Sequence, residues 1–243
     1  MVPMSARKLI IAIDGPAGAG KSTIASRLAR HLGYVNIETG AMYRALALKA
    51  IECDVGFDEE DALVSLANGS HIDLEPTIDG NRVILDGQDV TRRIRERDVT
   101  EAASQVSVHP GVREWMVSHQ RRMGEAGGVV MEGRDIGTKV FPDAEVKIFL
   151  DAAPEVRGER RFRQQGSAPA VIASAAEKSA AATAAEMRRR DERDRARANS
   201  PLVPAPDAVI SDSTGLTIEQ VMERVESLVA EKQSTAAHAN SRQ

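Results

Sequence analysis

Cysteine and aromatic residues are scarce in this chain of 243 residues, and each shortage excludes something. Cys53 is the single cysteine, so no disulfide can form within the chain, and a reducing compartment fits this usage. Its position at the end of an apolar helical pattern predicts a structural thiol rather than a nucleophile. Only 3% of the residues are aromatic, so aliphatic side chains must fill the core that 42% hydrophobic residues can build.

Long hydrophobic runs and an excess of positive charge are also missing. The longest aliphatic runs span about five residues, far fewer than the roughly 20 that cross a bilayer, and no signal peptide is recognisable. The net charge of −4 argues against general binding to nucleic acids or membrane surfaces. Five histidines lack metal-ligand spacing: His31, His71, His109, His119 and His238. We therefore expect a soluble, cytoplasmic protein with no nucleic-acid or membrane partner.

The most informative stretch is residues 9–23, LIIAIDGPAGAGKST. Five apolar residues are followed by a segment that fits the phosphate-binding pattern G-x-x-x-x-G-K-[ST] at every fixed position. Glycines let backbone N–H groups approach phosphates, and the helix that follows directs its positive dipole end at the anion. Lys21 would contact the β and γ phosphates, and the Ser22 hydroxyl would reach Mg²⁺. The predicted ATP-binding residues are Gly15, Pro16, Ala17, Gly18, Ala19, Gly20, Lys21, Ser22 and Thr23.

Strand and helix patterns alternate along the chain, which predicts an α/β fold with a parallel sheet flanked by helices, of the phosphate-loop NTPase type. Strands are expected at residues 9–13, 34–37, 129–131, 146–150 and 208–210. The expected helices cover residues 21–32, 41–52, 99–108, 111–124, 152–165, 186–198 and 217–232, with a further short helix that ends near residue 67. The strongly acidic and basic helix at 186–198 is preceded by an alanine-rich stretch at 167–185.

A small antiparallel element interrupts this alternation. Strand-like runs at 71–74 and 81–85 are separated by Asp79-Gly80 and followed by Asp86-Gly87, both turn signals. We interpret residues 69–98 as a small acceptor-binding insert in a core domain formed by 1–68 and 99–243. Residues 158–185 are predicted to form a helical lid, and 233–243 a disordered tail. Few large apolar side chains anchor the insert or the lid, so we expect both to be mobile.

Arginines gather in three further segments. Residues 38–44 (ETGAMYR) and 133–138 (GRDIGT) each follow a strand end, where open α/β sheets bind ligands, and the third segment is RDERDRAR at 190–197. On a helix, Arg190, Asp194 and Arg197 would share one face, while Arg195 would point elsewhere. Taken alone, residues 190–197 are equally consistent with a solvent-exposed helix stabilised by ion pairs. Arg44 and Arg134 at strand ends favour an anion-binding site.

These segments resemble those of bacterial cytidylate (CMP) kinases. GPAGAGKST, ETGAMYRA, AASQVS, EGRDIGTKVFPDAEVKIFLDA, RDERDR and NSPLVPAPDA occur in the order typical of that family, over roughly residues 8–230. EGRDIGT and RDERDR are specific to the family, whereas the phosphate loop is shared with many others. Glu38 and Thr39 stand where family members often have Asp and Ser or Thr, and the alanine-rich stretch matches no fixed family pattern.

The resemblance implies a role for each matching residue. The phosphate of the acceptor would be bound by Arg44, Arg134 and Arg197, with Thr39 beside them, and its ribose by Arg190 and Asp194. The cytosine edge would be read by Ser104, Arg113 and Asp135. The lid that closes over the ATP phosphates would supply Arg157, Arg160 or Arg161, Arg193 and Arg195. With Lys21, the predicted catalytic set is Arg157, Arg161, Arg193 and Arg195.

The implied reaction is transfer of the ATP γ-phosphate to CMP or dCMP, with Mg²⁺, by an enzyme expected to be a monomer. Another small phosphate-loop kinase, acting on UMP, shikimate or gluconate, is the nearest alternative; a hydroxyl acceptor would ordinarily need a carboxylate near the attacking oxygen. A GTP-dependent switch is a rival from another class, but the guanine-reading Asn-Lys-x-Asp motif is missing. An RNA-binding role for residues 188–197 is weakened by interleaved acids and few aromatics.

Overall fold

Five short strands rich in aliphatic residues form one parallel sheet in the interior of the molecule. The computed structural model describes residues 8–77, 80–164, 173–197 and 199–240. The strand order is β2-β6-β1-β7-β8, from β1 (Ile10–Asp14), β2 (Val35–Glu38), β6 (Val129–Gly133), β7 (Val146–Asp151) and β8 (Val209–Asp212). β1 lies in the middle, is buried at all five positions, and pairs in parallel with β6 and β7. Burial on both faces explains its unbroken apolar run.

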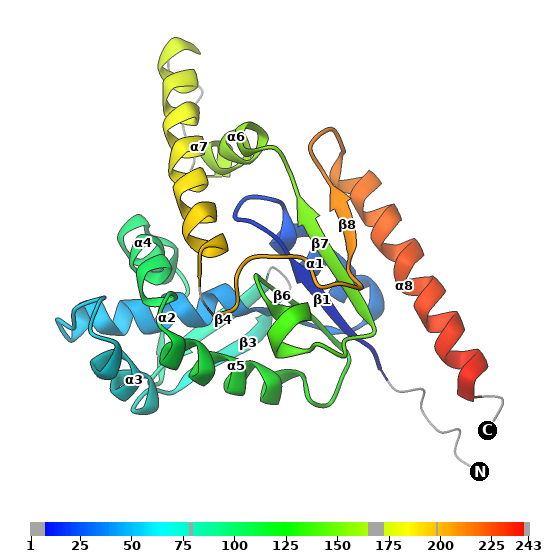
Figure 1. The fold of residues 1–243 in the computed structure, drawn as a ribbon, viewed down its shortest axis with the longest axis horizontal. Helices are drawn as coiled ribbons and strands as arrows, with labels where there is room; N and C mark the ends of the chain where they lie inside the picture. Colours follow the sequence, from blue (N-terminus) through cyan, green and yellow to red (C-terminus); the bar gives the residue numbers. More distant parts are fainter. Residues whose placement is uncertain (1–7, 78–79, 165–172, 198, 241–243) are drawn as a thin grey trace.

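Helices cover both faces of this sheet (Figure 1). On one face, α1 (Lys21–Leu32) and α8 (Ile218–Asn240) enclose a core that includes Ile11 and Ile13. On the other face, Ile10 and Ala12 pack with the wide helical turn η2 (Ile136–Val140) and with residues of α5 (Pro110–Gly124). The alternation of neighbouring β1 residues between two cores is the period-two pattern of a strand. The predicted α/β fold class is therefore confirmed.

A further group of elements forms a second body beside the parallel sheet. It contains α2 (Thr39–Glu52), α3 (Glu60–Asn68), the short helix η1 (Arg93–Arg95), α4 (Arg97–Val106) and an antiparallel sheet of β3 (Ile72–Thr77), β4 (Gly80–Leu85) and β5 (Gln88–Asp89). The separate antiparallel sheet agrees with the predicted hairpin and adds a third strand.

The insert is anchored more firmly than the sequence indicated. Ile72, Val83 and Ile94 are buried in the same cluster as residues of α2 and α4. The Asn81 side chain also bridges to β2, because its Oδ1 accepts the Glu38 amide at 2.9 Å and its Nδ2 donates to the Asn36 carbonyl at 2.8 Å. The expectation that few apolar side chains hold this segment is wrong, since its strands place aliphatic residues on one inward face.

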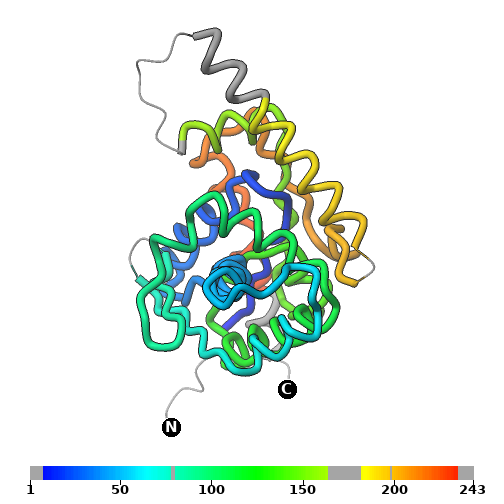
Figure 2. The backbone as a smooth tube through the Cα atoms, turned by 90° about the vertical axis from the view of Figure 1, so that its left-hand side faces the viewer, coloured from blue at the N-terminus to red at the C-terminus, as the bar shows by residue number. Residues whose placement is uncertain are grey.

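The predicted lid and C-terminal boundaries also change. α6 (Pro154–Gln164) is followed by α7 (Ala173–Arg195), one helix that combines most of the alanine-rich stretch with the charged segment. Figure 2 shows the charged part of α7 in yellow. The expected features at residues 165–172 lie outside the described residues. Because α7 ends at Arg195, Arg197 lies beyond the helix and not on its face. α8 continues to Asn240 instead of ending at residue 232, so the described part of the expected tail is helical.

Two smaller expectations concern the burial of Cys53 and the presence of membrane-spanning helices. Cys53 directly follows α2 and is exposed, so it is not the packed thiol that its apolar neighbours suggested. Across the described residues, no helix combines the length and the apolar character that crossing a membrane requires.

Candidate active site

The polar segments singled out in the sequence meet at one edge of the sheet. β1, β2, β6 and β7 run in parallel, so their carboxyl ends lie side by side. The phosphate loop follows β1, Thr39 begins the helix after β2, and Arg134 and Asp135 follow β6. Loops at the carboxyl ends of parallel strands are where open α/β sheets bind ligands. The fold therefore assembles one site from segments that are far apart in the sequence.

The phosphate loop connects β1 to α1 with a backbone that needs glycine. Gly15, Gly18 and Gly20 have φ angles of 143°, 75° and 99°, all in the region that other residues rarely adopt. Gly20 directly precedes α1, whose N-terminal N–H groups therefore face the loop. This arrangement provides the concave surface of N–H groups that a phosphate chain requires.

We predict that Gly15→Ala severely destabilises the protein. A Cβ at residue 15 would lie 1.9 Å from the Leu150 carbonyl oxygen of β7, and the φ of 143° is strained for any other residue. Overlap with backbone cannot be relieved by a side-chain rotation, so the loss should be about 3 kcal/mol or more of unfolding free energy. Thermal or urea unfolding of the variant measures this. Gly33→Ala is the control, because a Cβ there meets no atom within 4 Å although φ is also positive; equal losses in both variants would contradict the role of the Leu150 contact.

Lys21 lies inside the loop, with only 6% of its surface exposed. Its Nζ donates a hydrogen bond to the Pro16 carbonyl oxygen at 2.8 Å, so the ammonium group is folded back onto the loop. Burial, followed by the nearby positive charge of Arg134, lowers the pKa of Lys21 to about 7. An anion in the loop would reverse this effect by supplying the missing negative charge.

Glu132, at the end of β6, is a carboxylate that sequence reasoning did not select. It is buried, its pKa is raised to about 7 by burial and then by Glu38, and the Ser22 hydroxyl hydrogen-bonds to it. Its Oε1 has no hydrogen-bond partner. Thr39 Oγ1 donates to the Glu132 carbonyl oxygen at 2.7 Å, which joins the end of β6 to the start of α2. A buried, unpaired carboxylate oxygen beside Ser22 suits a hydrated cation.

The arginine segments meet next to Lys21. Arg134 Nε donates to Asp194 Oδ2 at 3.1 Å, and Arg197 donates to the other oxygen of the same carboxylate. Burial raises the pKa of Asp194, but Arg134 and Arg197 outweigh it and hold the value below its ordinary level. Arg44 donates to Glu38 Oε1 at 2.5 Å from the start of α2. Hydrogen bonds thus join Arg134, Asp194 and Arg197, while Arg44, held by Glu38, is close enough to Arg190 for their charges to interact.

The arginines of this cluster carry more positive charge than the carboxylates within it neutralise. Burial, and then the neighbouring Arg134, lower the pKa of Arg190 to about 10. The Nε atoms of Arg44, Arg190 and Arg197 are buried without a hydrogen-bond partner. Buried donors that lack partners are costly, and a bound anion would satisfy them.

Arg113 and Asp135 form a buried pair on the other side of the cluster. Arg113 donates to Asp135 Oδ2 at 2.6 Å and to the Ser107 carbonyl oxygen at 3.1 Å, and its guanidinium lies 5.6 Å from the Tyr43 ring centroid. Ser104 accepts a hydrogen bond from Arg193 at 2.8 Å. The three predicted base-reading residues thus come from α4, α5 and the segment after β6.

The predicted lid arginines divide into three environments. Arg157 is 2% exposed and fixed under the loop, because it donates to the carbonyl oxygens of Ala152 and Ala17 and pairs with Asp191 at 2.6 Å. Arg160 donates to Ser213 at both its hydroxyl and its carbonyl oxygen. These two side chains anchor α6 in this structure, and a role in closing over the ATP phosphates stays a prediction.

Arg161, Arg193 and Arg195 occupy different surroundings. Burial, and then the charge of Arg44, lower the pKa of Arg161, which places it electrostatically beside the acceptor cluster. Arg193 contacts Ser104, on the side of the base-reading pair. Arg195 is exposed and lines a cavity of about 490 Å³ together with Arg157 and Asp191, the pair that lies under the phosphate loop.

Comparison with known proteins identifies the family to which this site belongs. The sequence model named "Cytidylate kinase" matches residues 11–231. The chain belongs to the cytidylate kinase family. The cytidylate kinase of Geobacillus kaustophilus is 49% identical over 93% of this chain and 98% of its own length. The cytidylate kinase of Enterococcus faecalis is 48% identical over 93% of this chain and 97% of its own length.

Within this cytidylate kinase family member, the structure adds residues that sequence reasoning missed. Glu38 pairs with Arg44 and, at 3.7 Å, with Arg95, and Ser107 accepts a hydrogen bond from Arg197 at 2.8 Å. Asp14 accepts hydrogen bonds from two backbone amides far along the chain. Glu38 and Asp14 lie within the quoted stretches 38–44 and 9–23, but the sequence did not indicate that their side chains are buried. Ser107 is the last residue of the quoted AASQVS segment, of which only Ser104 was given a role.

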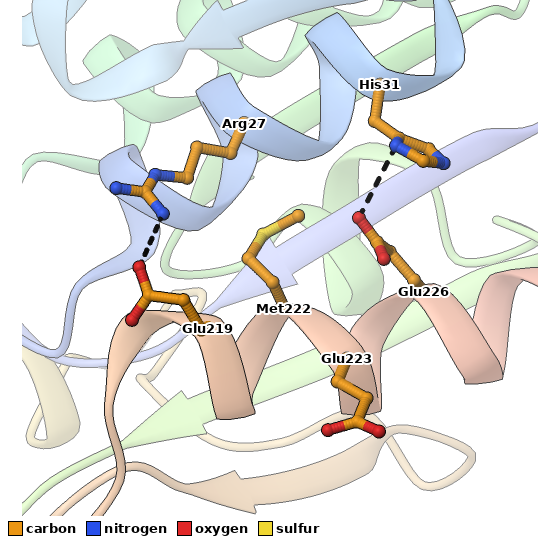
Figure 3. Close-up of a pocket in the computed structure, with 6 residues that line it drawn as sticks. All are labelled: Arg27, His31, Glu219, Met222, Glu223 and Glu226. Carbon is orange, nitrogen blue, oxygen red and sulfur yellow. Dashed lines mark hydrogen bonds and ion pairs between the residues drawn. The ribbon is translucent and has the colours of Figure 1, made fainter.

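A further cavity of about 330 Å³ lies between α1 and α8, remote from these residues (Figure 3). It is bordered by the ion pairs Arg27–Glu219 at 3.1 Å and His31–Glu226 at 3.6 Å. Its lining contains none of the predicted site residues, and both pairs are solvent-exposed and therefore weak. The candidate site of this cytidylate kinase family member is therefore the cluster at the strand ends, where the predicted residues meet.

Proposed function

We propose that the phosphate loop binds ATP and that the arginine cluster binds the phosphate of CMP or dCMP, to which the γ-phosphate is transferred. The observation that carries this assignment is the cluster of Arg44, Arg134, Arg190 and Arg197 next to Lys21, with three buried Nε atoms unsatisfied. An acceptor that is itself a phosphate supplies the negative charge that this cluster lacks. The activity is that of a nucleoside monophosphate kinase.

The proposed chemistry needs no strong general base. The second pKa of a phosphate monoester is about 6, so the acceptor phosphate is mostly a dianion at neutral pH. One of its oxygens forms the new bond to the γ-phosphorus, and the bond between that phosphorus and the β–γ bridging oxygen breaks, leaving ADP. Catalysis then consists of orientation and of charge stabilisation by Lys21 and an arginine of the lid. Exclusion of water by a closing lid would limit hydrolysis of ATP.

Ser22 and Glu132 are the protein groups that we expect to support Mg²⁺. The described residues contain no cluster of three or more His, Cys, Asp or Glu side chains suited to hold a metal ion. Phosphate oxygens must therefore complete the coordination, as is usual for Mg²⁺ in such enzymes. The unpaired Glu132 Oε1 and the Ser22 hydroxyl fit a hydrated Mg²⁺. When bound, Mg²⁺ supplies positive charge to the transferring phosphoryl group.

The remaining proposals concern the setting of the enzyme. We expect the enzyme to be a monomer. A CMP or dCMP acceptor would place it in pyrimidine nucleotide metabolism, and its single cysteine fits a reducing compartment such as the cytoplasm. Sedimentation of the purified protein tests the first of these proposals.

Among the lid arginines, we predict that Arg161 contributes most to phosphoryl transfer. Arg157 and Arg160 are occupied by backbone and hydroxyl groups, whereas Arg161 lies in the electrostatic field of Arg44 and Glu38. Arg161→Ala should lower kcat by about tenfold, because one cation that stabilises the transition state is removed. Arg160→Ala is the comparison and should mainly lower the unfolding temperature, since it breaks two hydrogen bonds. A larger loss of kcat in the Arg160 variant would contradict the assignment.

The decisive experiment for the overall function is ADP release from ATP and Mg²⁺ with each nucleoside monophosphate in turn. We expect CMP and dCMP to be used in preference to UMP, AMP and GMP. Shikimate and gluconate serve as hydroxyl acceptors in the same assay. Faster turnover with either of them, or a preference for GTP without any acceptor, would overturn the proposed acceptor and favour the alternatives raised by the sequence.

A further inference from the structure

Asp14 is a buried carboxylate that forms its hydrogen bonds with residues outside the phosphate loop. It is the last residue of β1 and directly precedes Gly15, but it is not one of the fixed positions of the loop pattern. Its side chain is 5% exposed. Oδ1 accepts the Ile136 amide and Oδ2 accepts the Gly137 amide, both at 2.8 Å. These amides lie more than 120 residues away in the sequence.

The two amides belong to the turn that follows β6. Asp135 directly precedes η2, and Ile136 and Gly137 are its first residues, so their N–H groups are the ones that the turn leaves free. One carboxylate satisfies both of them. Burial raises the pKa of Asp14 to about 6, so at neutral pH it is mostly ionised and both oxygens can accept. The other charged groups that face it are Asp135 and Lys21.

Close packing leaves this turn little freedom around the contact. A Cβ at Gly137 would lie 3.4 Å from Asp14 Oδ2 and 3.2 Å from the Lys147 side chain. Lys147 is in turn held by Asp207 at 2.8 Å. Moving the Ile136 and Gly137 amides would also move Asp135, the partner of Arg113.

We propose that Asp14 is the positioning residue of the acceptor side: its carboxylate fixes residues 135–137 and so orients Asp135 and Arg113 toward the base of the nucleotide. The donor loop and the acceptor-reading turn are thereby attached to the same strand end. This inference rests on the proposed function insofar as it assigns base reading to Asp135. It predicts that a substitution of Asp14, next to the ATP-binding loop, lowers kcat/KM for CMP and leaves KM for ATP almost unchanged.

Asp14→Asn tests the proposal with almost no change in volume. An amide group retains one acceptor oxygen but turns a donor toward the second backbone N–H, so one hydrogen bond is lost. We expect kcat/KM for CMP to fall about tenfold, largely through KM, the ratio of CMP to UMP use to decrease, and KM for ATP to stay within about twofold. Hydrogen exchange at Ile136 and Gly137 should become about tenfold faster.

Asp151→Asn is the matched control, because Asp151 also ends a strand of the sheet and its carboxylate accepts the amide of the neighbouring Ala152 at 2.8 Å. It should change neither the CMP to UMP ratio nor exchange at residues 136 and 137. If Asp14→Asn raises KM for ATP and spares CMP, Asp14 serves the phosphate loop and the proposal is overturned. An equal loss of kcat with CMP and with UMP, together with unchanged hydrogen exchange at Ile136 and Gly137, would overturn the proposal as well.

A measurement on the unaltered protein covers the case in which the variant does not fold. A scalar coupling across the hydrogen bonds, from the Ile136 and Gly137 nitrogens to the Asp14 carboxyl carbon, should be detectable by NMR, and its absence would overturn the proposal. A failure of the base-reading assignment can be distinguished from a failure of the role proposed for Asp14. If the wild-type protein uses UMP as well as CMP while the coupling is present, the base assignment fails and the attachment of the turn to Asp14 stands.

Discussion

Replacing Lys21 by alanine should lower kcat by a factor on the order of 10² or more while the protein remains folded. The Lys21 ammonium contacts the Pro16 carbonyl oxygen and no carboxylate at hydrogen-bonding distance among the described residues, so its main partner is the expected ligand. Its lowered pKa shows that the folded protein gains little from this buried charge. The loss of one charge that stabilises the transition state gives the expected factor. Steady-state kinetics and circular dichroism measure turnover and folding.

Lys139→Ala is a suitable control, because Lys139 is exposed and lies in η2 outside the phosphate loop. It should retain wild-type turnover. Near-normal turnover of the Lys21 variant would remove the phosphate loop from the mechanism. Because burial and the repulsion from Arg134 and Arg190 outweigh the attraction of Glu132 and Asp14, we expect the Lys21 variant to unfold at the same temperature as wild type or slightly above it.

Selectivity for cytosine over uracil should reach a factor on the order of 10² or more in kcat/KM. Arg113 can donate to N3 and O2 of cytosine, and Ser104 and Asp135 can accept from its amino group. Uracil would place its N3–H against the guanidinium and its O4 against the carboxylate. Each such buried mismatch costs roughly 1–3 kcal/mol, and two of them give the expected factor. Competition between CMP and UMP in one reaction measures the ratio directly.

Arg113→Met should reduce CMP use far more than UMP use and thereby narrow the ratio. Methionine retains much of the length of the side chain but cannot pair with Asp135, which Arg113 contacts at 2.6 Å. Arg122→Met is the control on the same helix, since Arg122 is exposed and donates to Ser118. Should wild-type enzyme use UMP as efficiently as CMP, these residues do not read the base, and the kinase assignment is unaffected.

The parts of the site that could be predicted from the sequence are those encoded by neighbouring residues. The phosphate loop is contiguous, and its glycines are required by the local backbone, as the contact of Gly15 with Leu150 illustrates. Thr39 and Arg134 were expected at strand ends because buried strands have a recognisable apolar pattern, and a parallel sheet brings such ends together. The family resemblance rested on the same contiguous segments.

What could not be predicted depends on how separate helices dock. Arg157 has the same residue type and a similar setting in sequence as Arg161, yet it is buried under the loop by Asp191 of α7. Arg193 is adjacent to the acceptor-cluster residue Asp194 but contacts Ser104, because successive residues of a helix face different directions. Glu38 and Asp14 are polar residues whose burial arises only when the sheet, α2 and η2 are assembled.

The length of α7 has a mechanical consequence. At 23 residues it spans about 34 Å, with Asp194 near one end and the segment that follows α6 at the other. Because an intact helix bends little, it works as a rigid rod: tilting by roughly 10° about the acceptor end would displace the opposite tip by about 6 Å. Small adjustments as Asp194 and Arg190 engage a nucleotide would thus be magnified at the Ala173 end of α7, beyond the contacts that Arg188 and Asp191 make with α6. Nucleotide binding at one end of this helix would thereby move its other end.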